Sequence, residues 1–455
     1  MSEEKRVHPG EDFDKTYPIW LLVPISLLFI VIWGWFKLVY GLRIIRDPAL
    51  KRLEGPAVYL GNHCSALDFF FMSIAFYPKR IHYVMSNVFL AKWWGKPVIK
   101  GLQQIPKSQF FAEAKSVMTM KRAIKRGCDI GIYPEGRMSL TGRTGYIAPS
   151  IGKLVKSFNA PVVIVKEEGF SLRKPLWSAK SRRGKLRLDC RLLLTAAEIG
   201  DLSAEEIYRR IVGALDYDDY AEQRAEGAPF GKSRRLSGEG RLAEGLELIL
   251  RRCPACGREL SMASAGNRLF CEECDFAVTL DEYNRLTPEG GAWPGRALDS
   301  IPAWYDWQAA GLRRLLLEPG YHYSSPVRLT ILSKDNFQPT DGGPARLCLD
   351  RDGVRLVREP AGFAGGEGDS RGGEGSGYDS PGAADGRGEA APDGPEVLLS
   401  FSPGQLPTIT GTLGRYVDLP GLEALYRPEF EDRRLPVFWM QAVEVLYELE
   451  NAPAE

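Results

Sequence analysis

The chain has 455 residues, enough for about two to four domains and a large buried core. Its hydrophobic content of 44% and charged content of 26% are ordinary for a globular protein, and a formal net charge of +1 excludes the strongly basic field of a general nucleic-acid binder. Four of the 8 cysteines form two CxxC pairs and the others are scattered, which argues against a disulfide framework and for a reducing compartment with a metal site.

Residues 1–45 are predicted to form a polar tail and a membrane anchor. Residues 16–36 carry no charge, and about twenty apolar residues are enough to cross a bilayer core. A signal peptide or a buried core helix fits this length and these flanks less well. Basic residues are denser after the segment, which predicts a cell-membrane protein with a cytoplasmic catalytic domain. Pro24 leaves open whether the segment is a single span or a shallow insertion.

Residues 46–225 alternate between strand-like and helix-like patterns, which predicts an α/β sheet flanked by helices. Sites in such sheets lie beyond the carboxyl ends of the strands. The expected strands are residues 58–60, 81–85, 129–133, 161–165 and 185–194, and the expected helices are residues 67–76, 111–126, 151–158 and 204–215.

The first candidate catalytic residues follow the strand at residues 58–60. Asn62-His63 ends the apolar run, and Asp68 lies five residues beyond the histidine. Imidazole exchanges a proton near neutral pH, and a carboxylate can hold it in one tautomer and stabilise its charged form. Residues five apart do not share a helix face, so we expect His63 in the loop, Ser65 as the N-cap and Asp68 inside the following helix.

A second motif, residues 133–139, follows the strand at residues 129–133 and contains Pro134-Glu135-Gly136. Taken alone, the first motif could be a capped turn with a structural histidine, and the second a turn at the end of a strand. Because both come directly after strands of one sheet, we expect them to face one another.

Four blocks in this order resemble the signature of the 1-acylglycerol-3-phosphate acyltransferase family. The resemblance covers roughly residues 45–220, and four ordered blocks are far more specific than any one of them. The blocks are Asn62-His63 with Asp68, residues 101–107 (GLQQIPK), residues 133–139 (YPEGRMS) and residues 160–165 (APVVIV).

The resemblance implies acyl transfer from an acyl thioester, acyl-CoA or acyl carrier protein, to the hydroxyl of a lysolipid. A hydroxyl is a poor nucleophile, so His63 is expected to act as general base and Asp68 to orient it. Direct transfer needs no enzyme nucleophile, and Cys64 is expected only to fill a variable position. The residues expected to bind substrate are Asn62, Lys107, Glu135, Gly136, Arg137 and Ser139.

Two positions depart from the family pattern and leave the acceptor open. The arginine of the third block stands one residue early, as Arg137, where it can still grip a phosphate. Residues 135–142 also resemble the acyltransferase part of 2-acylglycerophosphoethanolamine acyltransferases. Lys107 replaces the arginine of the second block, and can supply charge but not a bidentate fork; it could equally be a surface lysine.

Residues 226–285 are predicted to form a linker and a zinc ribbon. Two CxxC knuckles at this spacing are typical of a closed tetrahedral Zn²⁺ site with four thiolate ligands. Acidic neighbours and the lack of a basic–aromatic cluster favour a structural metal over nucleic-acid binding. The expected ligands are Cys253, Cys256, Cys271 and Cys274.

Residues 286–455 are predicted to form a small β-rich module that ends in a helix, with a disordered insertion at residues 361–395, which is dense in Gly, Asp, Glu and Ser. The preferred function for the whole chain is synthesis of phosphatidic acid from 1-acylglycerol-3-phosphate. Alternatives are an acyltransferase for another lysophospholipid and a catalytically inactive, membrane-bound lipid-binding scaffold. Expected partners are membrane lipids, a lysophospholipid acceptor and an acyl carrier protein, and no nucleic acid.

Overall fold

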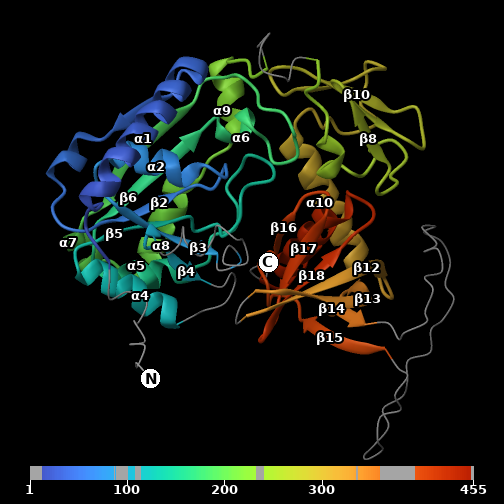
Figure 1. Cartoon of the computed structure of the whole chain (residues 1–455). Helices are drawn as coiled ribbons and strands as arrows, with labels where there is room; N and C mark the ends of the chain where they lie inside the picture. Colours follow the sequence, from blue (N-terminus) through green and yellow to red (C-terminus); the bar gives the residue numbers. More distant parts are fainter. Residues whose placement is uncertain are drawn as a thin grey trace, which may run out of the picture. The chain divides into compact units, whose positions relative to one another are not determined.

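The computed structural model describes residues 13–86, 88, 101–107, 114–231, 240–334, 337–358 and 395–451. The chain divides into two compact units (Figure 1). The first is Met1–Ala310 with Asp335–Phe337, and the second is Gly311–Lys334 with Gln338–Glu455. The predicted insertion at residues 361–395 lies outside the described residues, apart from its last residue.

A seven-stranded mixed sheet forms the centre of the first unit, in the order β1-β7-β6-β2-β5-β3-β4. Five neighbouring strands, from β6 to β4, run parallel, whereas β7 is antiparallel to β6 and β1 is parallel to β7. The strands are β1 (Arg43–Arg46), β2 (Val58–Gly61), β3 (Ile81–Ser86), β4 (Ile105–Lys107), β5 (Asp129–Ile132), β6 (Val162–Glu168) and β7 (Arg187–Leu194). The predicted α/β fold class is therefore confirmed.

Helices cover both faces of this sheet, because its central strands are apolar on both sides. On one face, Val58 and Leu60 of β2 join a core with α4 (Ala114–Lys125), α5 (Ser150–Phe158) and α8 (Ala204–Leu215). On the other face, Tyr59 packs edge-to-face on Phe76 of α2 (Asp68–Phe76), with ring centroids 4.5 Å apart. Shorter helices complete the domain: α6 (Phe170–Arg173), α7 (Ala196–Asp201) and α9 (Asp219–Glu226).

Most expected elements of this domain are present, with three differences. β6 continues to Glu168, beyond the predicted end at residue 165. The expected elements lacked the two edge strands, β1 and β4, and the short helices α6, α7 and α9. Ser65 is not the N-cap of α2: that position is taken by Leu67, whose N–H donates to Ser65 Oγ at 3.1 Å. Ser65 therefore forms a turn within the loop before the helix.

The apolar N-terminal segment forms one helix, α1 (Ile19–Tyr40), with Pro24 inside it. It is long and apolar enough to cross a membrane, with a mean hydropathy of 2.1 over Trp20–Tyr40. One side packs on the domain: Ile25 and Phe29 form a cluster with Ile74 of α2. The opposite side is exposed, and Leu38 keeps 80% of its surface accessible.

A small antiparallel sheet follows, with strands β8 (Met262–Ala265), β9 (Arg268–Cys271), β10 (Ala277–Leu280) and β11 (Leu286–Pro288). Buried polar contacts fix this sheet to the α/β domain of the same unit. Arg182 donates to Asn284 Oδ1 and to Leu242 O, both at 2.6 Å. Phe230 N donates to Glu282 O at 2.7 Å. The buried guanidinium of Arg182 thus links the two subdomains.

The second unit is an antiparallel seven-stranded sheet in the order β15-β14-β13-β12-β18-β17-β16. It follows α10 (Ile301–Leu317) and ends in α11 (Leu435–Asn451), as the predicted β-rich module with a terminal helix requires. The strands are β12 (His322–Ser333), β13 (Pro339–Asp350), β14 (Gly353–Arg358), β15 (Glu396–Phe401), β16 (Thr410–Thr412), β17 (Tyr416–Pro420) and β18 (Ala424–Glu429).

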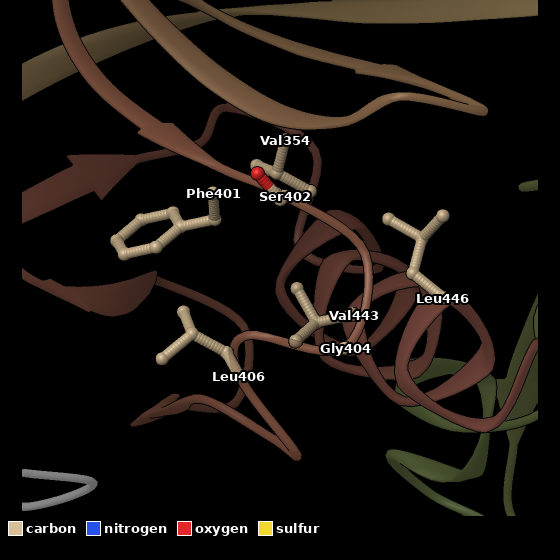
Figure 2. A pocket seen from close by; sticks show the side chains of 7 residues that line it. All are labelled: Val354, Phe401, Ser402, Gly404, Leu406, Val443 and Leu446. Atoms are coloured by element: carbon tan, nitrogen blue, oxygen red, sulfur yellow. The ribbon is translucent and has the colours of Figure 1, made fainter. Parts of the chain in front are cut away.

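A small apolar pocket lies between the sheet of the second unit and α11 (Figure 2). Val354 and Phe401 line it from the sheet, and Val443 and Leu446 line it from the helix. Its volume of about 10 Å³ is near the lower limit for one water molecule. The pocket is therefore a packing defect and not a site for a lipid chain.

Two helical glycines provide a test of the core packing. A Cβ on Gly152 of α5 would lie 2.1 Å from Ala204 O of α8, whereas a Cβ on Gly213 would meet nothing within 4 Å. Gly152→Ala should destabilise the protein by about 1–3 kcal/mol through overpacking. Gly213→Ala should stabilise it by about 0.5–1 kcal/mol through helix propensity. Thermal unfolding of both variants checks this, and equal effects would contradict the close contact of α5 and α8.

Candidate functional site

The candidate catalytic pair sits where β2 ends and α2 begins. His63 Nδ1 lies 2.8 Å from Asp68 Oδ2, and the backbone N–H of Cys64 donates to the same oxygen at 2.8 Å. The side chain of His63 is 26% exposed and that of Asp68 is 1% exposed. The imidazole stacks on the ring of Tyr133, with centroids 4.9 Å apart. The buried carboxylate thus fixes a ring whose other edge can reach solvent.

This arrangement can support general base catalysis. A carboxylate at Nδ1 favours the tautomer whose Nε2 lone pair is free to accept a proton, and it stabilises the imidazolium that results. Within the described residues, Nε2 of His63 makes no hydrogen bond, so this nitrogen is available to a substrate hydroxyl. The predicted contact between His63 and Asp68 is therefore present.

Glu135 holds the backbone around His63. It is buried, its Oε1 accepts from His63 N at 3.0 Å, and its Oε2 accepts from Gly145 N at 2.7 Å. Burial raises the pKa of Glu135 to about 7, against the opposing effect of these two backbone donors. The motifs after β2 and β5 therefore meet, as expected, and Glu135 is the group that joins them.

The loop after Glu135 continues this contact. Gly136 has a φ of 70°, a left-handed conformation that favours glycine and turns the chain back toward His63. Ser139 N donates to His63 O at 2.8 Å, and Ser139 Oγ donates to Arg143 O at 2.7 Å. Arg137 lies half-buried in the same loop. The structure thus places Gly136, Arg137 and Ser139 in the loop that Ser139 joins to His63.

Asn62 joins β2 to β6. Its Oδ1 accepts from Glu167 N at 2.7 Å, and its Nδ2 donates to Glu167 O at 2.9 Å. Its side chain is completely buried. These contacts give Asn62 a positioning role, and a contact with substrate stays a prediction.

Lys107 is the last residue of β4, the edge strand of the parallel part of the sheet. Because β4, β3, β5 and β2 are parallel, Lys107 lies at the same carboxyl edge as His63, three strands away. Residues 108–113, which follow it, lie outside the described part of the chain. Its role in binding an anionic substrate stays a prediction.

The sequence interpretation missed one charged residue of the site, Glu167. It follows the apolar run of β6, and strand alternation places it on the same face as Val163 and Val165. It is completely buried, and burial raises its pKa well above the usual range, with repulsion from Asp68 as the next cause. The sequence did contain a signal for this residue, because an acid follows two valines at alternate positions and so lies on the same buried face of the strand.

Cys64 is an unsuitable nucleophile. Its thiol is buried, and this burial raises its pKa well above the ordinary value, so the reactive thiolate is disfavoured. The expectation that Cys64 is not an acyl-enzyme nucleophile agrees with this environment.

The four cysteines of the predicted ribbon form one cluster, with all four Sγ atoms within 4.8 Å of one another. Cys253 Sγ lies 3.7 Å from Cys274 Sγ, and Cys256 Sγ lies 3.8 Å from Cys271 Sγ. Tetrahedral Zn–S bonds of about 2.3 Å place sulfurs about 3.8 Å apart. Backbone N–H groups two residues on, at Ala255 and Glu273, point at Sγ as in a metal knuckle. The donor set and its spacing fit a tetrahedral metal.

Comparison with known proteins agrees with this site. The family model described as Acyltransferase matches residues 18–166, which hold α1, the His63–Asp68 pair and the Glu135 loop. The match covers about a third of the chain.

Among solved structures, the chain is similar to the 1-acyl-sn-glycerophosphate (LPA) acyltransferase PlsC from Thermotoga maritima. The identity is 14% and the TM-score is 0.37, over 46% of this chain and 80% of that one.

Proposed function

We propose that this protein transfers a fatty acyl chain from an acyl thioester to the free hydroxyl of 1-acylglycerol-3-phosphate, which gives phosphatidic acid for phospholipid synthesis. One observation carries the proposal: a buried carboxylate holds Nδ1 of a partly exposed histidine inside the region that the Acyltransferase family model matches. The same pair disfavours the alternative of an inactive lipid-binding scaffold, since packing alone does not require this geometry.

The reaction follows from the pair. Nε2 of His63 removes the proton of the acceptor hydroxyl as its oxygen attacks the thioester carbonyl carbon. The C–S bond then breaks, and the departing thiolate takes the proton from the imidazolium. Asp68 stabilises the imidazolium between these steps. Glu135 and Ser139 act on the reaction through the backbone of His63, which they hold from both sides.

The acceptor phosphate is assigned to Arg137 and Lys107. Both lie at the carboxyl edge of the sheet, and a guanidinium and an ammonium suit a phosphate monoester. The donor is acyl-CoA or acyl carrier protein. The competing acceptor, a 2-acylglycerophosphoethanolamine, is a zwitterion and would gain less from these two cations.

His63→Ala should lower kcat at least about a hundredfold with 1-acylglycerol-3-phosphate, because the general base is lost. The assay uses full-length protein in detergent, both donor types and a panel of lysolipids. His322→Ala is the matched control, because His322 is exposed in the second unit. Full turnover in His63→Ala would refute the base assignment. If the protein prefers the ethanolamine acceptor, the proposed substrate is wrong but the proposed acyl transfer stands.

We also propose that the cysteine cluster binds one structural Zn²⁺. The metal, when bound, would be held by Cys253, Cys256, Cys271 and Cys274 and would supply folding free energy to a sheet with little core of its own. Because Arg182 and Phe230 tie this sheet to the acyltransferase domain, the metal would also stabilise that domain.

Metal analysis should find about one zinc per chain, and Cys256→Ser should lower this stoichiometry and the unfolding temperature. Cys348→Ser is the control, since Cys348 lies outside the cluster. Freshly purified, unchelated protein without zinc, or an unchanged unfolding temperature in Cys256→Ser, would count against the site.

We further propose that α1 inserts into one leaflet of the cell membrane and does not span it, with the catalytic domain on the cytoplasmic side. Contacts with the domain run along the helix, from Ser26, bonded to Tyr77, to Val39, whose carbonyl accepts from Arg183 at 3.0 Å. These contacts are about 20 Å apart along the axis. A spanning α1 would have to separate from the domain over this length, whereas its exposed apolar side can enter a leaflet while the domain stays attached.

Glutamates on the exposed side of α1 should weaken membrane binding. Leu27 and Val31 are 59% and 68% exposed, and the double variant Leu27→Glu, Val31→Glu should lower binding to vesicles at least about tenfold by removing buried apolar area. The control is Val397→Glu, Leu422→Glu, which changes two apolar residues in the second unit that are 57% and 86% exposed. An N-terminal epitope that inside-out vesicles protect from protease would show a span.

A further inference from the structure

A buried carboxyl group lies behind the His63–Asp68 pair. Glu167, near the end of β6, has no exposed surface, and Asn62 fixes its backbone through hydrogen bonds of 2.7 and 2.9 Å. Strand alternation turns its side chain toward the face of the sheet that α2 covers, and Asp68 is the first residue of α2. The backbone contacts hold this carboxyl group at a fixed place beside the catalytic carboxylate.

If Asp68 and Glu167 are both ionised, some of their buried oxygens have no hydrogen-bond donor. Asp68 Oδ2 takes the imidazole and the Cys64 N–H, whereas Asp68 Oδ1 and both oxygens of Glu167 are buried without a partner among the described residues. The two groups lie within hydrogen-bonding reach of each other. Ionised carboxylates only accept hydrogen bonds, so the two groups can bond to each other only when one of them carries a proton.

The proton belongs on Glu167. Burial raises the pKa of Glu167 well above its usual range, and the negative charge of Asp68 raises it further. Asp68 has two N–H donors that stabilise its charged form, and Glu167 has none at its carboxyl group. These contacts and charges thus favour a proton on Glu167 over a proton on Asp68.

The surrounding groups preserve this assignment. Asp219 of α9 adds negative charge that raises the pKa of Glu167, and Arg173 of α6 opposes it with a smaller effect. Burial also raises the pKa of the other titratable groups near Glu167, so they stay neutral. These are Cys64, Tyr83, Tyr133 and Cys190.

We propose that Glu167 is a neutral carboxylic acid that donates its proton to Asp68 Oδ1 and so positions the Asp68 carboxylate for His63. The catalytic pair is then the outer part of a three-membered chain that runs from His63 through Asp68 to β6. Glu167 touches no reacting atom and acts only through Asp68. This inference rests on the proposed acyl transfer, because it assigns a further positioning residue to the same site.

Two substitutions distinguish the role of Glu167 as a hydrogen-bond donor from a role as a negative charge. Glu167→Gln keeps a neutral N–H donor for Asp68 Oδ1, and its kcat should stay within about threefold of the original protein. Glu167→Leu removes the donor at similar volume, and kcat should fall about tenfold with KM nearly unchanged, since a buried acceptor is left unpaired. Glu168→Gln is the control: it removes the neighbouring carboxylate, which pairs with Arg187 on β7. Its kcat should not change.

The pH profile of kcat/KM gives a readout that a merely structural residue would not move. The acid limb of this profile reports the protonation of His63. In Glu167→Gln it should stay at the same pH, because no charge is removed. In Glu167→Leu it should move to higher pH, because Asp68, without its donor, holds the imidazolium more strongly. An acid limb that moves to lower pH in Glu167→Gln would show that Glu167 is ionised, and would overturn the proposal.

An infrared measurement tests the proton without any assay of activity. The difference spectrum between the original protein and Glu167→Gln near neutral pH should contain the C=O stretch of a neutral carboxylic acid. A carboxylate band in its place would overturn the proposal even if Glu167→Leu fails to fold. If the protein has no turnover with any donor and acceptor, the acyltransferase proposal fails, whereas the infrared result still decides the protonation of Glu167.

Discussion

The site depends on the hydrogen bond between His63 Nδ1 and Asp68 Oδ2, and much of the surrounding structure serves to hold its two ends. The His63 backbone is gripped on both sides, its N–H by Glu135 and its carbonyl by the N–H of Ser139. Asp68 is gripped by the N–H of Cys64 and by the start of α2. These contacts come from the carboxyl ends of adjacent parallel strands, where loops from different parts of the sequence meet.

Buried acids fasten those loops. Loop N–H groups at a sheet edge have no strand partners, and each must be satisfied when it is buried. Glu135 accepts from the backbone N–H groups of His63 and Gly145. Asp219 accepts from the backbone N–H groups of Gly169 and Ser171. Burial raises the pKa of both acids to about 7, so this fastening opposes the ordinary preference of a carboxyl group for water. Burying these two acids lowers the stability of the fold. In return, their carboxyl oxygens hold the loop backbone in a geometry that apolar side chains, which accept no hydrogen bonds, could not maintain.

Local patterns were sufficient to predict the central strands of the sheet, the main helices and the meeting of His63 with Asp68, because apolar periodicity and strand ends fix these features. The edge strands β1 and β4 were not predicted. Local patterns could not predict that the side chains of Glu135 and Asn62 form hydrogen bonds with backbone groups of other segments, since the partners of a buried polar group are set by strand order. Glu167 was missed for the same reason: only the pairing of β2 with β6 brings it to Asp68. The N-cap at Ser65 was wrong because a turn at Leu67 delays the helix.

The cysteine module is connected by hydrogen bonds to the loop that holds His63. Ser139, which holds His63, donates to the carbonyl of Arg143, and the guanidinium of Arg143 binds Asp306 of α10 in a bidentate ion pair of 2.5 and 2.9 Å. Two residues further along α10, Gln308 accepts from the two backbone N–H groups that precede Cys253. A continuous series of hydrogen bonds and one helix therefore joins the loop that holds His63 to the first cysteine knuckle. Because the polar groups in this series are largely paired with each other, loss of order at the knuckle would leave α10 without its anchor and Arg143 without a fixed partner, and the loop that positions His63 would lose its outer support.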